Sequence, residues 1–371
     1  MGFNGLATHA TKRVAPHTVS KTIRPSALLL TLACVLAFAS FARAQDILPK
    51  HITPQAQAAI KKGLDFLAKT HSQNGSFSMG QDGQAYPVAM TSLAGMAFLA
   101  NGNTPSRGPY AEHVAKIVEY LTSNIQENGL ITGPSQEQGY SMYGHGFALM
   151  FLSSCYGMET NDRMRERMKK IIDGGIKLTA SASSNGGWCY TPGNGDEGSV
   201  TVTQIQGLRA ASNAGFTVPK GAIEGGVHYL EMCKSPDGGI CYSLSQTGSE
   251  AHLPISAAAI ATLYNAGQYD SKLADSCLTY VKKQFDMKKD SFDKGGNYGH
   301  TYYTHLYASQ AFYQAGDQYW DDYFPGARDQ LIKLQAQDGS WPGDGVGQTF
   351  GTSIALVILQ LPYKYLPIYQ R

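Results

Sequence analysis

Hydrophobic and polar positions divide the chain into two alternating kinds of stretch. In the first kind, apolar residues stand three or four apart, as Ile223, Val227 and Leu230 do between Pro219 and Met232. This spacing is typical of an amphipathic helix with one buried face. The second kind, such as Pro254 to Tyr264, is small and apolar almost throughout. A helix of that kind is buried among other helices, so the pattern predicts an outer helix followed by an inner one.

A turn signature separates the two helices and returns roughly every 53 residues, which marks a repeat architecture. Its copies are Asn74-Gly75-Ser76-Phe77, Asn128-Gly129-Leu130, Asn185-Gly186-Gly187-Trp188, Asp237-Gly238-Gly239-Ile240 and Asp338-Gly339-Ser340-Trp341. The last interval is about twice the others, and the degenerate stretch Asp290 to Gly296 falls within it. Six units are therefore present.

These units predict six pairs of helices. We expect outer helices to begin near Pro54, Pro109, Asp162, Pro219, Ser271 and Asp322, and inner helices near Pro87, Gly144, Ser199, Pro254, Thr301 and Gly351. Paired helices of this kind form either an open solenoid or a closed double ring. Because the inner helices carry little charge, we predict an all-α fold, an (α/α)6 toroid of six helical hairpins. The longer outer-to-inner loops mark the face that carries function.

The two ends of the chain differ from this pattern. Residues 1–44 combine a basic stretch, an apolar run from Ala27 to Phe41 and the small-residue site Ala42-Arg43-Ala44, as in a signal peptide. We expect cleavage before Gln45, a secreted or periplasmic protein and no stable membrane span after cleavage. Residues 45–371 then form a single domain. Its irregular, proline-rich segment 361–371 is expected to lie over the ring exterior.

Charge limits the classes of binding partner, and the cysteine content raises the question of disulfide bonds. Residues 45–371 hold 25 basic and 28 acidic residues, and such a chain lacks the basic surface that binds nucleic acid. Five cysteines remain in that part, and some of them could pair in an oxidising compartment. A short bridge between Cys233 and Cys241 is sterically possible. Alternatively, these cysteines are small buried hydrophobic residues.

The repeated turns, each ahead of a small-residue helix, resemble those of the squalene cyclase and protein prenyltransferase β-subunit superfamily. The segment Leu334 to Trp341 is similar to the glutamine–tryptophan motif of that superfamily. The resemblance spans about Gln55 to Leu361 and implies the α/α toroid. It implies activity less directly, because one fold hosts many functions.

The catalytic motifs of the superfamily are missing from this chain. There is no Asp-x-Asp-Asp acid of the triterpene cyclases, and the pair Asp321-Asp322 is interpreted as a helix cap. The Cys-Gly-Glu-Gln string of the thioester-containing relatives is also missing. Asp275-Ser276-Cys277 matches the Asp-x-Cys of the prenyltransferases, but it falls in an outer helix and is out of place.

Polar residues at two neighbouring inner-helix entrances suggest a metal site. Glu250, His252 and His300 would supply three ligands and leave an open position, which is the pattern of a catalytic zinc. The alternatives are polar rim residues that cap helices, or acid–base chemistry without a metal. The cofactor is therefore unknown, with zinc as one candidate.

Further candidates lie in or near the inner helices. His145 and His305 could face the central cavity as catalytic groups, or they could be core histidines. Glu197 and Glu250 could divide the roles of acid and base, as two carboxylates do in sugar-cleaving enzymes. Alternatively, Ser199 caps the helix and the acidic residues near it complement the helix dipole.

Tyrosines could bind the ligand directly. Tyr143, Tyr302 and Tyr303, with Tyr140 and Tyr307, could line an apolar cavity or stack on sugar rings, unless they only pack the core. Three functions follow as hypotheses. The first is an exported toroid that binds an apolar or extended ligand, such as an isoprenoid lipid or a peptide. The second is a polysaccharide hydrolase or lyase, and the third is a metal-dependent prenyltransferase-like transferase.

Overall fold

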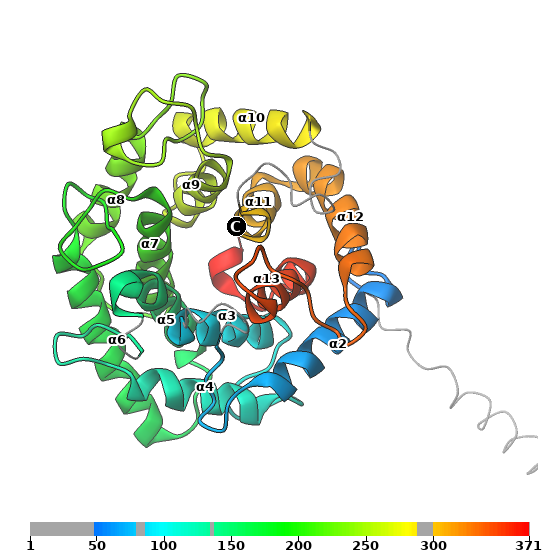
Figure 1. Ribbon diagram of the computed structural model, residues 1–371. Coiled ribbons are helices and arrows are strands. Elements are labelled where there is room, and N and C mark those ends of the chain that lie inside the picture. The colour runs from blue at the N-terminus through cyan, green and yellow to red at the C-terminus, as the bar shows by residue number, and fades with distance from the viewer. Residues whose placement is uncertain (1–47, 79–85, 134–136, 288–299, 371) are drawn as a thin grey trace, which may run out of the picture. The chain divides into compact units, whose positions relative to one another are not determined.

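The computed structural model describes residues 48–78, 86–133, 137–287 and 300–370, and Leu48–Arg371 form one compact unit. The outer helices are α2 (Pro54–Thr70), α4 (Ala111–Ser123), α6 (Asp162–Ala182), α8 (Lys220–Met232), α10 (Lys272–Met287) and α12 (Asp317–Leu334). The inner helices are α3 (Pro87–Ala100), α5 (Ser141–Tyr156), α7 (Gly198–Asn213), α9 (Leu253–Asn265), α11 (Thr301–Ala315) and α13 (Gln348–Gln360). They form two concentric rings (Figure 1), so the predicted all-α toroid is confirmed.

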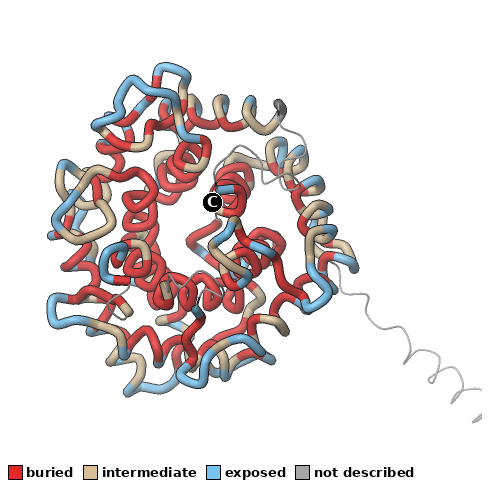
Figure 2. Tube along the Cα trace, in the orientation of Figure 1, coloured by how far each residue is buried: buried red, intermediate tan, exposed pale blue. Residues whose placement is uncertain are grey.

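Burial differs between the two rings as the sequence pattern predicts. Every residue of α3 is buried, whereas α4 buries one face that includes Val114, Ile117 and Leu121. Figure 2 shows the inner ring almost wholly buried and exposed positions gathered on the outside. Burial of apolar side chains between the rings is the main force that holds the hairpins together.

In four of the five described turns, the turn glycine packs closely against the backbone of the next outer helix. Gly75 has a φ of +85°, and a Cβ placed on it would lie 2.6 Å from the carbonyl oxygen of Lys116 in α4. A side chain is therefore excluded both by conformation and by space. The same approach recurs at Gly129 toward Gly174, at Gly186 toward Gly225 and at Gly339 toward Lys62. This contact explains why the signature returns along the chain.

A second repeated contact ties each turn to its own inner helix. The residue two positions after the turn glycine donates its backbone N–H to a side chain in the first turns of the inner helix. Phe77 N–H, for example, donates to Thr91 Oγ1 at 2.8 Å. The equivalent acceptors in other units are Thr201, Ser256 and Thr352. In the second unit the acceptor is Nδ1 of His145, which lies 3.1 Å from Ile131 N.

The sixth hairpin closes on the first. Gln360 Nε2 donates to Ala97 O at 3.1 Å, which joins α13 to α3. In the outer ring, Asp321 of α12 pairs with Lys50 at 2.6 Å and with His51 at 2.7 Å. Asp321 is therefore not the helix cap that the sequence suggested. Helix α12 begins at Asp317 rather than near Asp322, because it starts directly after Gly316 and continues through Pro325.

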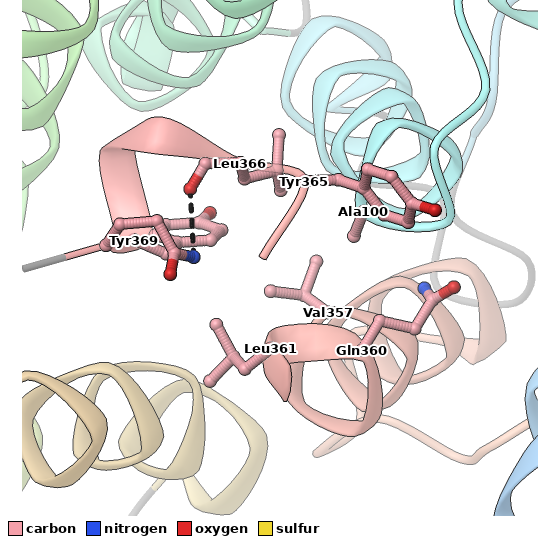
Figure 3. A pocket seen from close by; sticks show the side chains of 8 residues that line it. Ala100, Val357, Gln360, Leu361, Tyr365, Leu366 and Tyr369 are labelled. Carbon is pink, nitrogen blue, oxygen red and sulfur yellow. Dashed lines mark hydrogen bonds between the residues drawn. The ribbon is translucent and has the colours of Figure 1, made fainter. Parts of the chain in front are cut away.

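The C-terminal segment enters the ring instead of lying over its exterior. After two short 3₁₀ turns, η4 (Leu361–Tyr363) and η5 (Pro367–Tyr369), Tyr369 is only 1% exposed. Leu366 and Tyr369 lie beside Ala100 and Val357 in the ring interior (Figure 3). Gln314 Nε2 donates to Gln370 O at 3.3 Å. The expected position was wrong because the apolar residues of this segment bury themselves at the C-terminal ends of the inner helices.

Some expectations fall outside the described residues. The proposed signal peptide, residues 1–44, and the degenerate turn from Asp290 to Gly296 are among them. In the part of the chain that is described, none of the helices has both the length and the apolar character needed to cross a membrane.

Candidate functional site

Tyrosines from four successive outer-to-inner loops form a continuous line at the N-terminal ends of the inner helices. We call Tyr86, Tyr140, Tyr190 and Tyr242 the tyrosine arc. The rings of Tyr86 and Tyr140 have centroids 5.9 Å apart, and those of Tyr140 and Tyr190 are 4.9 Å apart. The hydroxyl of Tyr190 is hydrogen-bonded to that of Tyr242. The arc therefore crosses the entrances of α3, α5, α7 and α9.

The arc is accessible from outside the ring. Tyr140 is 44% exposed, and Tyr86, Tyr190 and Tyr242 are half-buried. The pairs Tyr86–Tyr140 and Tyr140–Tyr190 meet edge to face, which is a favoured aromatic geometry. Tyrosine combines a large apolar face with a polar hydroxyl, so this surface suits a ligand that carries both apolar faces and hydrogen-bonding groups.

Glu197 lies behind the arc and connects it to helix α7. Its carboxylate accepts a hydrogen bond from Val200 N at 2.5 Å and another from Ser199 Oγ at 2.7 Å. Ser199 is in turn hydrogen-bonded to Tyr143 OH, and Tyr242 also bonds the carboxylate. Burial raises the pKa of Glu197, and these hydrogen bonds oppose that rise. The residue is thus both the N-cap of α7 and the centre of a hydroxyl network.

A second buried carboxylate, Glu137, caps the neighbouring helix α3. It accepts hydrogen bonds from Gly133 N at 2.9 Å and from Val88 N and Ala89 N, both at 3.3 Å. Burial raises the pKa of Glu137, and the three backbone donors partly offset this effect. A carboxylate at a helix N-terminus is stabilised by the helix dipole. Both buried carboxylates near the arc therefore cap the N-terminus of an inner helix.

The space below the entrance is crossed by polar side chains. Gln206 Nε2 of α7 donates to Gln310 Oε1 of α11 at 2.9 Å, although α9 separates these two helices in the ring. Nearer the entrance, Tyr303 OH donates to Ser199 O at 3.2 Å. The buried ring of Tyr307 lies edge-on to Tyr303, with centroids 4.8 Å apart. These residues form a floor between α7 and α11.

The two histidines predicted to face the cavity lie between the helical layers. His145 is buried and bonded on both ring nitrogens, since its Nε2 lies 2.9 Å from Thr179 Oγ1 of α6. Burial lowers the pKa of His145 to about 4. His305 Nδ1 lies 2.9 Å from Tyr323 OH of α12, and burial lowers its pKa to about 3. Both side chains are directed toward the outer ring and not toward the arc.

The structure does not bring the three proposed metal ligands together. Glu250, His252 and His300 are all described and all exposed. Among the described residues, no three His, Cys, Asp or Glu side chains are grouped so that they could hold a metal ion. His252 packs its ring against Tyr242 at 5.5 Å. The geometry of this entrance therefore gives no support to a zinc centre there.

The two carboxylates of the proposed acid–base pair lie in different environments. Glu197 is 1% exposed and bonded within the entrance. Glu250 is exposed, and its charge acts on Tyr280 of the outer helix α10. The carboxyl pair of a sugar-cleaving enzyme flanks one bond of the substrate. The pairing of Glu197 with Glu250 as acid and base therefore stays a prediction.

Of the three tyrosines predicted to bind the ligand, two lie at the entrance. Tyr143 and Tyr303 both bond to Ser199. Tyr302 is only 4% exposed, and its backbone N–H donates to Asp344 at 2.6 Å. No sequence pattern singled out Tyr86, Tyr190, Tyr242 or Glu137. Alignment of the six units could have found the tyrosines, because each stands in an outer-to-inner loop.

No family model matches the sequence, and no curated protein matches it. Solved structures do match in fold. The type II terpene cyclase MstE from Scytonema has a TM-score of 0.54 at 14% identity, over 85% of this chain and 100% of that chain. A GH76 α-mannanase from Bacteroides thetaiotaomicron gives 0.59 at 9% identity, over 83% and 96%. An α-amylase from Clostridium perfringens gives 0.55 at 14%, over 83% and 98%.

These similarities show the fold and nothing finer. The chain has a helical toroid fold like that of the type II terpene cyclase, in agreement with the fold that the resemblance in the repeated turns implied. Glycosidases among the matching structures have the same toroid fold. Activity must therefore be argued from the residues at the entrance.

Proposed function

We propose that this protein is an exported binding protein that holds an extended, uncharged ligand along the tyrosine arc. The observation that carries the proposal is the continuity of the arc across four inner-helix entrances. Aromatic side chains with a few fixed polar groups are the usual lining of ligand sites. A line of four rings suits an elongated ligand better than a compact one.

The charges near the arc favour an uncharged ligand. The charged groups that act on the arc tyrosines are the carboxylates of Glu137 and Glu197. Both are buried and bonded to helix N-termini. An anionic ligand such as a prenyl diphosphate would be repelled by these carboxylates, and no cation is named among the described groups that act on the arc tyrosines. Neutral isoprenoids, neutral glycans and uncharged peptide segments remain compatible with the site.

The floor of the entrance favours a ligand that lies across the mouth. The bond from Gln206 to Gln310 and the bond from Tyr303 to Ser199 both cross the interior. The C-terminal segment occupies the opposite end, where Tyr369 is buried. A ligand threaded through the ring would have to break these contacts, whereas a ligand on the arc would break none of them.

The test is a binding titration with a neutral oligosaccharide, a neutral polyprenol and an uncharged peptide, together with native mass spectrometry of the purified protein. We expect one class to bind, and Tyr140→Ala to weaken it about tenfold, since a hot-spot aromatic contributes more than about 1 kcal/mol. Tyr140→Phe is the matched control, because it keeps the ring. Equal affinity of wild type and the alanine variant for every ligand would exclude the arc as the site.

Glycoside hydrolysis is the second candidate, and Glu197 favours it. Its carboxyl group is buried beside the arc with a raised pKa, as is required of a general acid. The glycosidases among the matching structures include an α-mannanase and an α-amylase. We would measure release of reducing sugar from α-mannan and starch. A hydrolytic role requires Glu197→Gln to abolish that activity, and no release from either polymer would count against it.

Export is part of the proposal and rests on residues 1–44 alone. Their basic, apolar and small-residue regions have the order of a signal peptide. Mass spectrometry of the protein recovered from the host's exterior or periplasm should give a mature N-terminus at Gln45. Recovery of the intact chain from the cytoplasm would contradict export while leaving the proposed ligand site open to test.

A further inference from the structure

Two histidines lie in contact where the first outer helix, α2, adjoins the second, α4. His71 follows the last residue of α2, and His113 lies in the first turn of α4. His113 Nδ1 and His71 Nε2 are 2.8 Å apart. We infer that this pair is a binding site for a divalent late transition-metal ion such as Cu²⁺ or Ni²⁺, independent of the tyrosine arc.

The hydrogen bonds leave His71 in the form that binds a metal. His71 Nδ1 lies 2.8 Å from the carbonyl oxygen of Ser72. Because a carbonyl can only accept, Nδ1 carries the proton and Nε2 presents its lone pair toward His113. Metal-binding histidines commonly donate their other ring N–H to a backbone carbonyl, which fixes the tautomer. His71 therefore already has the orientation of a ligand.

The separation of the two nitrogens suits two adjacent ligands of one ion. Two nitrogens each about 2.0 to 2.1 Å from a metal are about 2.9 Å apart at a right angle and about 3.4 Å apart at a tetrahedral angle. The observed 2.8 Å is the length of a hydrogen bond, and it shows that the two nitrogens already lie as close as adjacent ligands of one ion. Imidazole suits late transition metals, and a nitrogen site binds Cu²⁺ and Ni²⁺ more tightly than most other divalent first-row ions.

Packing holds both rings in place. His113 stacks on Phe98 with centroids 5.8 Å apart and planes 14° apart, and His71 packs against Phe77 at 6.0 Å. Both imidazoles are therefore held by aromatic neighbours next to each other.

Binding requires one proton to move. The Nδ1–H of His113 now lies between the rings, so the ring must change tautomer: Nδ1 gives up its proton, and Nε2 of the same ring takes one up from solvent. Glu112 lies near the pair and its charge acts on both rings, although its carboxylate now bonds Lys116 at 2.7 Å. No third ligand is grouped with the pair in the described structure. Water completes the coordination.

The test is calorimetric titration of the whole protein with Cu²⁺ and Ni²⁺ chloride, followed by electron paramagnetic resonance of the copper form. We expect one site that His113→Gln and His71→Asn each weaken at least tenfold, with a spectrum from two equivalent imidazole nitrogens. His228→Gln is the control, because His228 is exposed and its side chain pairs with Glu231 on the same helix, away from the His71–His113 pair. Thermal unfolding must show that each variant remains folded.

Two outcomes would overturn the site. One is copper affinity and stoichiometry that are unchanged in both pair variants. The other is an equal loss in His228→Gln, which would indicate binding to scattered surface histidines. A fold-disrupting effect of His113→Gln would be recognised by its unfolding temperature, and His71→Asn, at the half-buried residue that follows α2, would then decide the question.

Discussion

The repeated turns and the tyrosine arc both lie in the loops that lead from outer to inner helices, yet their contacts differ in how regularly they recur. In the turns, Gly75, Gly186 and Gly339 make the same close contact with the next outer helix. In the arc, successive units contribute different loops and different partners, and Tyr190 and Tyr242 bond across units. Regularity among the units thus accompanies packing, and departure from it marks the candidate site.

His145 shows why a repeated packing contact must be distinguished from a contact that marks the candidate site. A histidine in an inner helix suggests chemistry, but Thr91, Thr201 and Thr352 do the same work in other units. His145 accepts the same backbone bond from Ile131. An unusual residue type is therefore not enough to indicate function. The contact that the residue makes must also differ from that of its repeat equivalents.

The largest expected effect on stability is at the turns. Gly186→Val should lower the free energy of unfolding by about 3 kcal/mol or more, because Gly186 has a φ of +81° and a Cβ would lie 2.2 Å from Gly225 O. Gly193→Val is the matched control, since Gly193 has a φ of +87° with open space around it. Its cost should be about 1 kcal/mol. Urea unfolding measures both, and equal losses would refute the packing explanation.

Acid should destabilise the protein through His145. Its pKa is about 4 in the folded chain and higher in the unfolded chain, so the unfolded chain binds more protons below the ordinary pKa. Stability is therefore lost as the pH falls from about 6.5 to about 4, by about 3 kcal/mol for this residue.

The measurement is urea unfolding at several pH values for wild type and His145→Asn, which can still accept from Ile131. The variant should lose less stability on acidification. The raised pKa values of Glu137 and Glu197 have the opposite sign and are common to both proteins. The same pH dependence in both proteins would show that His145 is not the group responsible.

A smaller effect is expected from the cap of α7. Glu197→Ala removes the acceptor for Val200 N and Ser199 Oγ, and loss of an N-cap costs about 1 kcal/mol. Glu197→Gln keeps an oxygen acceptor and should lose less. If the two substitutions destabilise equally, the hydrogen bonds to this side chain do not hold the entrance together.

The smallest effect on stability is expected in the arc. Tyr140→Ala should change the free energy of unfolding by less than about 0.5 kcal/mol, because its side chain is exposed. The same variant should lose ligand affinity, so it separates the arc from the turns most clearly. A loss of stability comparable with that of Gly186→Val would assign Tyr140 to packing.

The sequence was enough to predict the toroid because the signals for it are local and recur. A glycine turn, an amphipathic stretch and an apolar stretch each act within one unit, and six copies reinforce one another. Most helix starts were therefore close to those observed, as at Pro54, Pro87 and Thr301. The start of α12 was placed five residues late, near Asp322 instead of Asp317, because Pro325 disfavours helix without preventing it here.

The entrance was much harder to predict, because its contacts join residues of different units. Nothing near Tyr190 in the sequence indicates that its hydroxyl meets Tyr242, or that Tyr303 reaches Ser199 from two units away. The grouping of Glu250, His252 and His300 relied on helix order alone. Loop conformation decides whether such residues converge, and the described structure shows no metal-binding group among them.

The approach of Gly339 to Lys62 has a consequence for how the protein comes apart. Because this contact repeats those of Gly75, Gly129 and Gly186, the first and last hairpins are joined along a seam like those between earlier hairpins. Open solenoids have outermost repeats that fray first, whereas a closed circle has no outermost member. A single proteolytic cut in any surface loop would leave the two fragments held along two seams, so the nicked protein should remain associated until denaturant breaks both.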